Sequence, residues 1–153
     1  MRVMNKMICL AGFVSCFLAH SAFSADGLLE INQSCAVNSG CFTGDAPGFP
    51  VTITGTGSYL LTGNLEVPAD TDGIVIEARS TTLDLNGFII KGHSTSGTGV
   101  YLQEWNIEVR NGTIASFDYG IQNLLLSDPS TGDRFVDLRL VQNRTIGLYP
   151  VSY

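Results

Sequence analysis

The sequence predicts an all-β fold of the β-solenoid class, in which short strands stack in successive coils. Three observations support this fold: a repeat with a period near 25 residues, 17 glycines in 153 residues, and a charged fraction of only 14%. An average soluble domain has about 25% charged residues, so long charged helices and disordered tails are both disfavoured. The length fits one domain.

The first 24 residues are predicted to form a secretory signal peptide. Two basic residues precede an apolar run over 7–19, and small residues follow at Ala22 and Ser24. We therefore expect cleavage after Ser24 or Ala25 and a secreted or periplasmic protein. The run has 13 residues, whereas a membrane-spanning helix needs about 20. No second apolar run of that length follows, so no membrane span is expected.

The net charge argues against nucleic acid as a partner. Loss of residues 1–24 removes two basic side chains and leaves six against 14 acidic ones, so the net charge changes from −6 to −8. Surfaces that bind nucleic acid need clustered Lys and Arg side chains to replace the counterions of the phosphates. The mature chain has the opposite balance.

Two cysteines, Cys35 and Cys41, remain after cleavage. In an oxidising compartment such a pair is expected to form a disulfide. A redox-active pair is the alternative, although its cysteines would normally be two residues apart. We expect residues 25–49 to be an N-terminal cap segment that this disulfide closes, followed by β-helix coils over 50–153.

The coils are predicted from a glycine that is followed by an apolar residue. This pair recurs at Gly73, Gly99, Gly120 and Gly147, with intervals of 26, 21 and 27 residues. Self-similarity at such a period indicates a stacked repeat array, and each unit has room for two or three short strands. We expect about four coils, over 50–72, 73–98, 99–119 and 120–146. A leucine-rich repeat is the competing solenoid, because residues 138–143 read L-x-L-x-x-N once.

A second motif predicts a bend that successive coils share. Residues 83–85 align with 107–109 at an offset of 24, and the Asn-Gly pairs at Asn86 and Asn111 align at an offset of 25. Asn and Gly tolerate a left-handed backbone best. We expect one inserted residue, Arg110, to account for the difference in offset.

Three segments, 41–53, 57–65 and 82–88, resemble the opening of secreted bacterial right-handed parallel β-helix proteins of the pectate-lyase-like superfamily. The resemblance covers residues 30 to 150 and implies that fold and a bacterial secreted or periplasmic location. The superfamily includes polysaccharide lyases, epimerases and proteins of no assigned reaction, so no catalytic motif is implied. Its members tend to have more coils. The resemblance therefore implies a C-terminally truncated helix, whose open last coil could self-associate.

Asp84 and Glu108 are predicted to form a column of carboxylates on successive coils. Asp137 joins them if residues 136–139 align with 107–110, whereas a match of Asn143 with Asn111 would shift that register by three. Like charges about 4.8 Å apart repel. The neutralising groups could therefore be nearby arginines, or a Ca²⁺ ion, which prefers carboxylate and carbonyl oxygens.

A calcium site would suit a polysaccharide lyase or epimerase acting on uronate polymers. Calcium would polarise the uronate carboxylate, and Lys91, Arg110 or Arg139 would take the α-proton. Alternatively, Arg110 and Arg139 neutralise the carboxylates and no metal binds. The charge of −8 opposes an acidic substrate, so an absence of catalysis is the preferred expectation.

Aromatic side chains suggest binding of an extracellular polysaccharide instead. Strand alternation places four residues on the outer side of one column: Val75, Tyr101, Gln122 and Tyr149. Trp105 points inward if its strand begins early, and faces solvent if it lies in a turn. His93 is expected to be a solvated loop residue. The sequence favours a polysaccharide-binding or cell-surface module, with the calcium-dependent enzyme and an adhesin-like assembly segment as alternatives.

Overall fold

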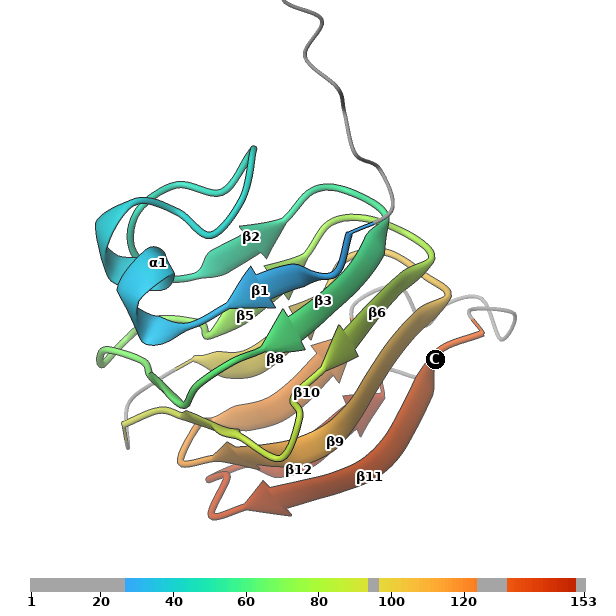
Figure 1. The fold of residues 1–153 in the computed structure, drawn as a ribbon. Coiled ribbons are helices and arrows are strands. Elements are labelled where there is room, and N and C mark those ends of the chain that lie inside the picture. The colour runs from blue at the N-terminus through green and yellow to red at the C-terminus, as the bar shows by residue number, and fades with distance from the viewer. Residues whose placement is uncertain (1–26, 94–96, 124–131, 151–153) are drawn as a thin grey trace, which may run out of the picture.

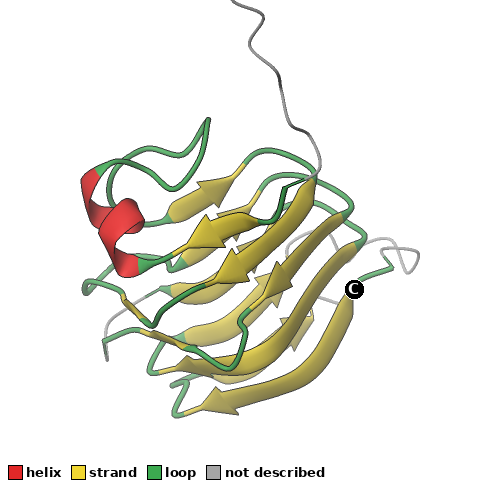
Figure 2. Cartoon of the chain, in the orientation of Figure 1, coloured by secondary structure: helices red, strands yellow, loops and turns green. Residues whose placement is uncertain are grey.

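The computed structural model describes residues 27–93, 97–123 and 132–150. These residues form a parallel β-solenoid of about four turns with one short helix, as Figures 1 and 2 show. The predicted all-β solenoid is therefore confirmed. The predicted signal peptide, 1–24, lies outside the described residues.

The strands follow one another turn by turn. The N-terminal segment contains β1 (Leu29–Ile31) and α1 (Gln33–Asn38), and the first turn contains β2 (Val51–Ile53), β3 (Gly57–Leu61) and β4 (Leu65–Glu66). The second turn contains β5 (Ile74–Ile76), β6 (Thr81–Asp84) and β7 (Ile89–Lys91), and the third contains β8 (Thr98–Leu102) and β9 (Ile107–Ala115). The fourth contains β10 (Tyr119–Asn123) and β11 (Arg134–Val141), and β12 (Ile146–Pro150) follows.

Two parallel sheets result from this stacking. Sheet B has the order β2-β5-β8-β10-β12, and sheet A contains β1, β3, β6, β9 and β11 together with β4 and β7. Strand β9 pairs with β6 along its first half and with β7 along its second half. Sheet A therefore bends, and the two sheets enclose a core of stacked aliphatic side chains.

The predicted glycine repeat is confirmed to the residue. Ile74 pairs with Val100, Val100 with Ile121, and Ile121 with Leu148, so the glycine before each of them stacks in one column. Close approach of the backbones explains the choice of glycine. A Cβ on Gly73 would lie 2.5 Å from the carbonyl oxygen of the next glycine in the column, where no side chain fits.

The shared bend is also confirmed, but the predicted register is wrong. Asn86 and Asn111 have φ angles of +50° and +60°, and Asp137 takes the third position with +50°. Before the bend, however, Asp84 pairs with Arg110, an offset of 26 and not 24. The second turn has extra residues between β6 and β7, whereas β9 passes through the bend as one strand. The insertion therefore lies in the second turn and is not Arg110.

The N-terminal segment closes one end of the solenoid. The predicted disulfide between Cys35 and Cys41 is present, and α1 lies at this end in Figure 1. Asp45 joins the cap to the first turn, because its carboxylate accepts hydrogen bonds from the N–H groups of Cys41 (2.8 Å) and Thr52 (2.9 Å). Part of the predicted cap segment also joins the solenoid, since β1 pairs with β3.

The other end has less cover. Ile146 and Leu148 of β12 are 38% and 36% exposed, although earlier members of the Leu148 column are fully buried. Self-association through this last coil stays a prediction. Within residues 27–93, 97–123 and 132–150, no helix is long and apolar enough to cross a membrane.

Candidate functional site

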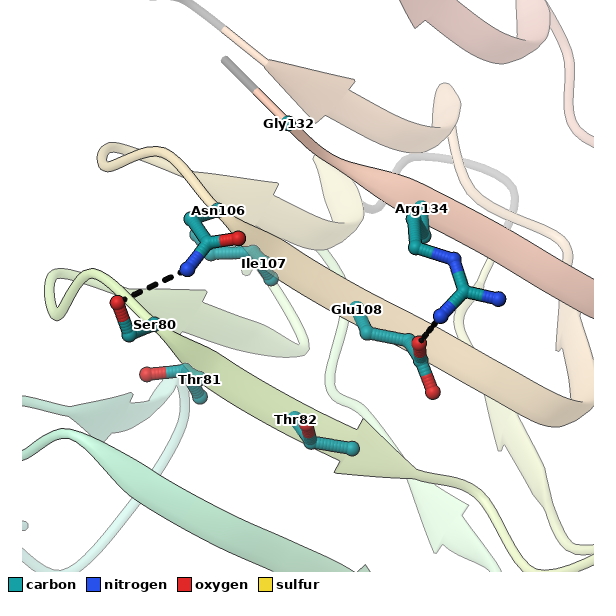
Figure 3. Close-up of a pocket in the computed structure, with 8 residues that line it drawn as sticks. All are labelled: Ser80, Thr81, Thr82, Asn106, Ile107, Glu108, Gly132 and Arg134. Carbon is teal, nitrogen blue, oxygen red and sulfur yellow. Dashed lines mark hydrogen bonds and ion pairs between the residues drawn. The ribbon is translucent and has the colours of Figure 1, made fainter.

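A shallow groove of about 220 Å³ lies on sheet A, across strands β6, β9 and β11 (Figure 3). Two rows of residues line it because parallel strands repeat their register. The first row stands where the strands begin, and its members all have positive φ angles: Ser80, Asn106 and Gly132. The second row lies two residues further along and consists of Thr82, Glu108 and Arg134.

Two residues that line the groove, Glu108 and Arg134, belong to a chain of ion pairs in which carboxylates and guanidiniums alternate. This chain, the ladder, consists of Asp84, Arg110, Glu108 and Arg134. Glu108 uses both carboxylate oxygens: Oε1 lies 2.9 Å from Arg110 Nη1 and Oε2 lies 2.7 Å from Arg134 Nη1. Arg110 also contacts the coil above through Nε, which donates to Asp84 Oδ2 at 2.9 Å. Opposite charges thus alternate across three coils.

This ladder corrects the predicted column of carboxylates. With an offset of 26, Thr82 lies directly above Glu108, and Asp84 lies above Arg110. Arg134, and not Asp137, lies opposite Glu108 in the next coil, so neither register considered for the last coil is correct. Of the two neutralising arginines expected, Arg110 pairs with both carboxylates.

The pKa values of Asp84 and Arg110 are shifted by their contacts in the ladder. Burial alone would raise the pKa of the Asp84 carboxyl, but hydrogen bonds from the Asn86 N–H and from the side chains of Arg110 and Asn111 outweigh burial and lower it. The pKa of Arg110 is raised, mainly by its hydrogen bond to Asp84 and further by Glu108, against a smaller lowering by burial. Both groups are therefore held in their charged forms.

The three candidate bases lie apart from one another. Lys91 is at the end of β7, where its Nζ lies 3.4 Å from Glu66 Oε2. Arg110 is committed to the ladder. Arg139 is exposed on β11 beyond the bend, where it pairs in register with Thr113 of β9. Of the three, Arg110 alone contacts a residue that lines the groove.

Asp84 and Glu108 do not combine with Asp137 as the calcium prediction required. Asp137 occupies the bend of β11, beyond the ladder. Within the part of the chain that the structure describes, no group of three His, Cys, Asp or Glu side chains is placed to hold a metal ion. Calcium binding stays a prediction, but the column of Asp84, Glu108 and Asp137 on which it was based is not formed.

Trp105 directly precedes Asn106 of the first row and is not itself one of the residues that line the groove. It lies in the turn between β8 and β9, so the solvent-facing alternative is confirmed, and it is 43% exposed. Its carbonyl oxygen accepts a hydrogen bond from the N–H of Ser80 at 3.2 Å, which fixes it beside the first row. The Arg79 guanidinium lies 4.8 Å from the centre of the ring, a cation–π contact.

The tyrosine column lies on the other sheet. Val75, Tyr101, Gln122 and Tyr149 pair in register along sheet B, as predicted. Tyr101 is half-buried, and burial followed by the nearby Asp72 carboxylate raises its pKa. Val75 is only 6% exposed, and the side chain of Tyr149 lies outside the described residues. Trp105 lies in the turn after β8 and is not a member of this column.

His93 is exposed, as predicted for a loop residue. It borders a second, open hollow of about 460 Å³ together with Ser116, Phe117 and Arg144. Arg144 is already paired there, since its Nε lies 2.7 Å from Asp118 Oδ1. This hollow lies at the corner that follows β7 and β9, away from Trp105.

Ser80, Thr82, Asn106 and Arg134 were not predicted as site residues. The signal that could have found them is an offset of 26, which aligns Ser80 with Asn106 and Asn106 with Gly132. The Asn-Gly pairs gave an offset of 25 instead. With that offset Ser80, Asn106 and Gly132 do not align, so the groove residues were not predicted.

Comparison of the chain with protein-family models, curated proteins and solved structures gives no match. The parallel β-solenoid that the family resemblance implied is present, and membership of the pectate-lyase-like superfamily stays a prediction.

Proposed function

We propose that this chain is a secreted or periplasmic β-solenoid that binds an extracellular polysaccharide without acting on it. The binding surface is the groove on sheet A, extended by Trp105. The observation that supports this proposal is that the exposed Trp105 directly precedes Asn106 and bonds through its backbone to Ser80, two members of the row of hydroxyl and amide groups. Aromatic faces stack on the apolar faces of sugar rings, while polar groups orient the hydroxyls.

Binding is favoured over catalysis by the state of the candidate bases. Proton abstraction requires a group that can lose its own proton near neutral pH. Arg110 is held in its charged form by two carboxylates, and Lys91 pairs with Glu66 away from the groove. The disulfide between Cys35 and Cys41 supports an oxidising compartment.

Trp105 provides a direct test because it is the single tryptophan of the chain. A glycan array would first identify oligosaccharides that bind. Titration with one of them should then change the intrinsic tryptophan emission, since the ring would lose water on one face. Absence of binding to every glycan on the array would contradict the proposal.

Two aromatic variants locate the site. Trp105→Ala should weaken binding by about tenfold, as expected when an aromatic side chain that contacts the ligand is truncated. Tyr101→Ala is the matched control, because it removes an aromatic ring from sheet B and should leave the affinity unchanged. Isothermal titration calorimetry measures both without relying on fluorescence. A loss confined to the Tyr101→Ala variant would place the site on the other sheet.

A further inference from the structure

We infer that the groove binds a neutral glycan and discriminates against polyuronates. This inference rests on the proposed function and specifies the ligand of the same site. It follows from how the charges of the groove are already paired and from which polar groups remain.

Glu108 and Arg134, the two charged residues that line the groove, are both ion-paired in the ladder. Each oxygen of Glu108 contacts a different arginine, Arg110 or Arg134. Arg110 in turn contacts Asp84. The ladder therefore contains two carboxylates and two guanidiniums and has no net charge.

Two residues next in sequence to the groove lining carry opposite charges: Arg79, which precedes Ser80, and Asp133, which follows Gly132. The Arg79 guanidinium lies against the ring of Trp105. The Asp133 carboxylate accepts a hydrogen bond from the N–H of Ile107 at 2.9 Å and another from the Asn123 side chain. The two charged residues that line the groove, Glu108 and Arg134, therefore cancel, although the mature chain as a whole would be acidic.

The remaining polar groups are neutral and suit sugar hydroxyls. Asn106 Nδ2 donates to Ser80 Oγ at 3.0 Å, and its Oδ1 faces Gly132, where the missing side chain leaves access from solvent. Thr82 adds a second, half-buried hydroxyl to the groove. Hydroxyls both donate and accept hydrogen bonds, so this row can pair with the vicinal hydroxyls of a pyranose ring.

A uronate carboxylate would unbalance this arrangement. If it paired with Arg134, whose charge Glu108 already balances, the ladder would gain a third carboxylate for two guanidiniums and a net negative charge. A neutral sugar leaves the ladder intact. Repulsion between like charges is a general device by which a site rejects the wrong partner.

The repeat also sets the length and direction of the ligand. Strands β6, β9 and β11 are successive neighbours in sheet A, and three strands at the usual spacing span about 10 Å. The two rows in Figure 3 run across these strands, along the solenoid axis. The groove therefore has room for about two pyranose rings lying parallel to that axis.

The test compares neutral hexasaccharides with hexagalacturonate of equal length. The probes are cello-, xylo-, manno- and maltohexaose, titrated against the wild-type chain at low and high salt. We expect at least one neutral probe to bind with an affinity that salt does not change, and hexagalacturonate to bind at least about tenfold more weakly. Equal or tighter binding of hexagalacturonate would overturn the inference while leaving the proposed function in place. Failure of all five probes, and of every glycan on the array, would overturn the proposed function itself.

A charge variant tests the cause of the discrimination. Glu108→Gln would release Arg110 and Arg134 from their shared carboxylate and should raise the affinity for hexagalacturonate by about tenfold. Glu66→Gln is the matched control, because it removes the same charge from β4, beyond the bend of sheet A, and should have no effect. If the Glu108→Gln variant folds, as judged by circular dichroism, and gains no affinity, ion pairing does not set the specificity. If it does not fold, Asp84→Asn releases Arg110 from a carboxylate that does not line the groove and should raise the affinity for hexagalacturonate by about threefold. No gain in that affinity would overturn the inference.

Discussion

The two ends of the solenoid bury equivalent interior positions to different extents. At the N-terminal end, Val51 and Ile53 of the first turn are fully buried, in one core cluster with Ile31 of β1 and Ala36 of α1. At the other end, Leu148 belongs to the same column as Val51 and is 36% exposed. In a stacked array each coil is covered by its neighbours. The comparison therefore shows that the cap replaces a neighbouring coil.

Shortening a side chain in the interior column that contains Ile121 and Leu148 should have the largest effect on the free energy of unfolding. Ile121 is fully buried between Val100 and Leu148, so Ile121→Ala should lower the free energy of unfolding by about 2 to 5 kcal/mol through lost burial and a cavity. Leu148→Ala should cost about 1 kcal/mol, since its side chain already contacts solvent. Chemical denaturation measures both. Equal costs would show that the last coil is covered in solution.

The glycine column gives a second comparison along the same axis. In Gly99→Ala the new Cβ would lie 2.6 Å from the carbonyl oxygen of Gly120 and would also contact Ile114. The backbone must move, at a cost of about 3 kcal/mol. In Gly147→Ala the nearest atom is Leu140 Cβ at 3.1 Å, so the cost should stay below about 1 kcal/mol. Thermal and chemical denaturation would report the difference. A tolerated Gly99→Ala would contradict the close stacking of these coils.

Removal of the disulfide tests how far the cap stabilises its own end. The double variant Cys35→Ala, Cys41→Ala should lose about 2 kcal/mol, the chain-entropy contribution of so short a closed loop. Wild-type protein should lose a similar amount in reductant, and the variant should not respond to reductant. Hydrogen exchange would locate the effect, which we expect in β1, α1 and β2. Uniform loss of protection in all coils would instead indicate that the cap stabilises the whole solenoid.

The sequence predicted positions where the backbone has no freedom better than positions on the surface. The glycine column could be predicted because a side chain at Gly73, Gly99 or Gly120 would meet the carbonyl oxygen of the next glycine. The bend could be predicted because its backbone is left-handed, a conformation that Asn86 and Asn111 tolerate. The surface register depends on how many residues separate two strands, and β9 crosses the bend without a break where β6 and β7 do not. Asp84 and Glu108 were therefore placed in one column, and the groove residues were missed.

The ion-pair ladder should give the smallest effect on stability, and its sign depends on pH. Because the folded-state pKa of Asp84 lies below its ordinary value of 3.8, the contribution of this carboxylate is present above that value and is lost as the pH falls through the folded-state pKa. Asp84→Asn should therefore lower the free energy of unfolding near neutral pH, by less than about 1 kcal/mol because Arg110 is partly exposed. Below the folded-state pKa the variant and the wild type should be equally stable. Urea denaturation, from neutral pH down to below the folded-state pKa of Asp84, measures the difference in stability between the variant and the wild type. Glu77→Gln, at an exposed site, is the control. A difference that persists in acid would mean that Asp84 acts through its neutral hydrogen bonds at the bend and not through its charge.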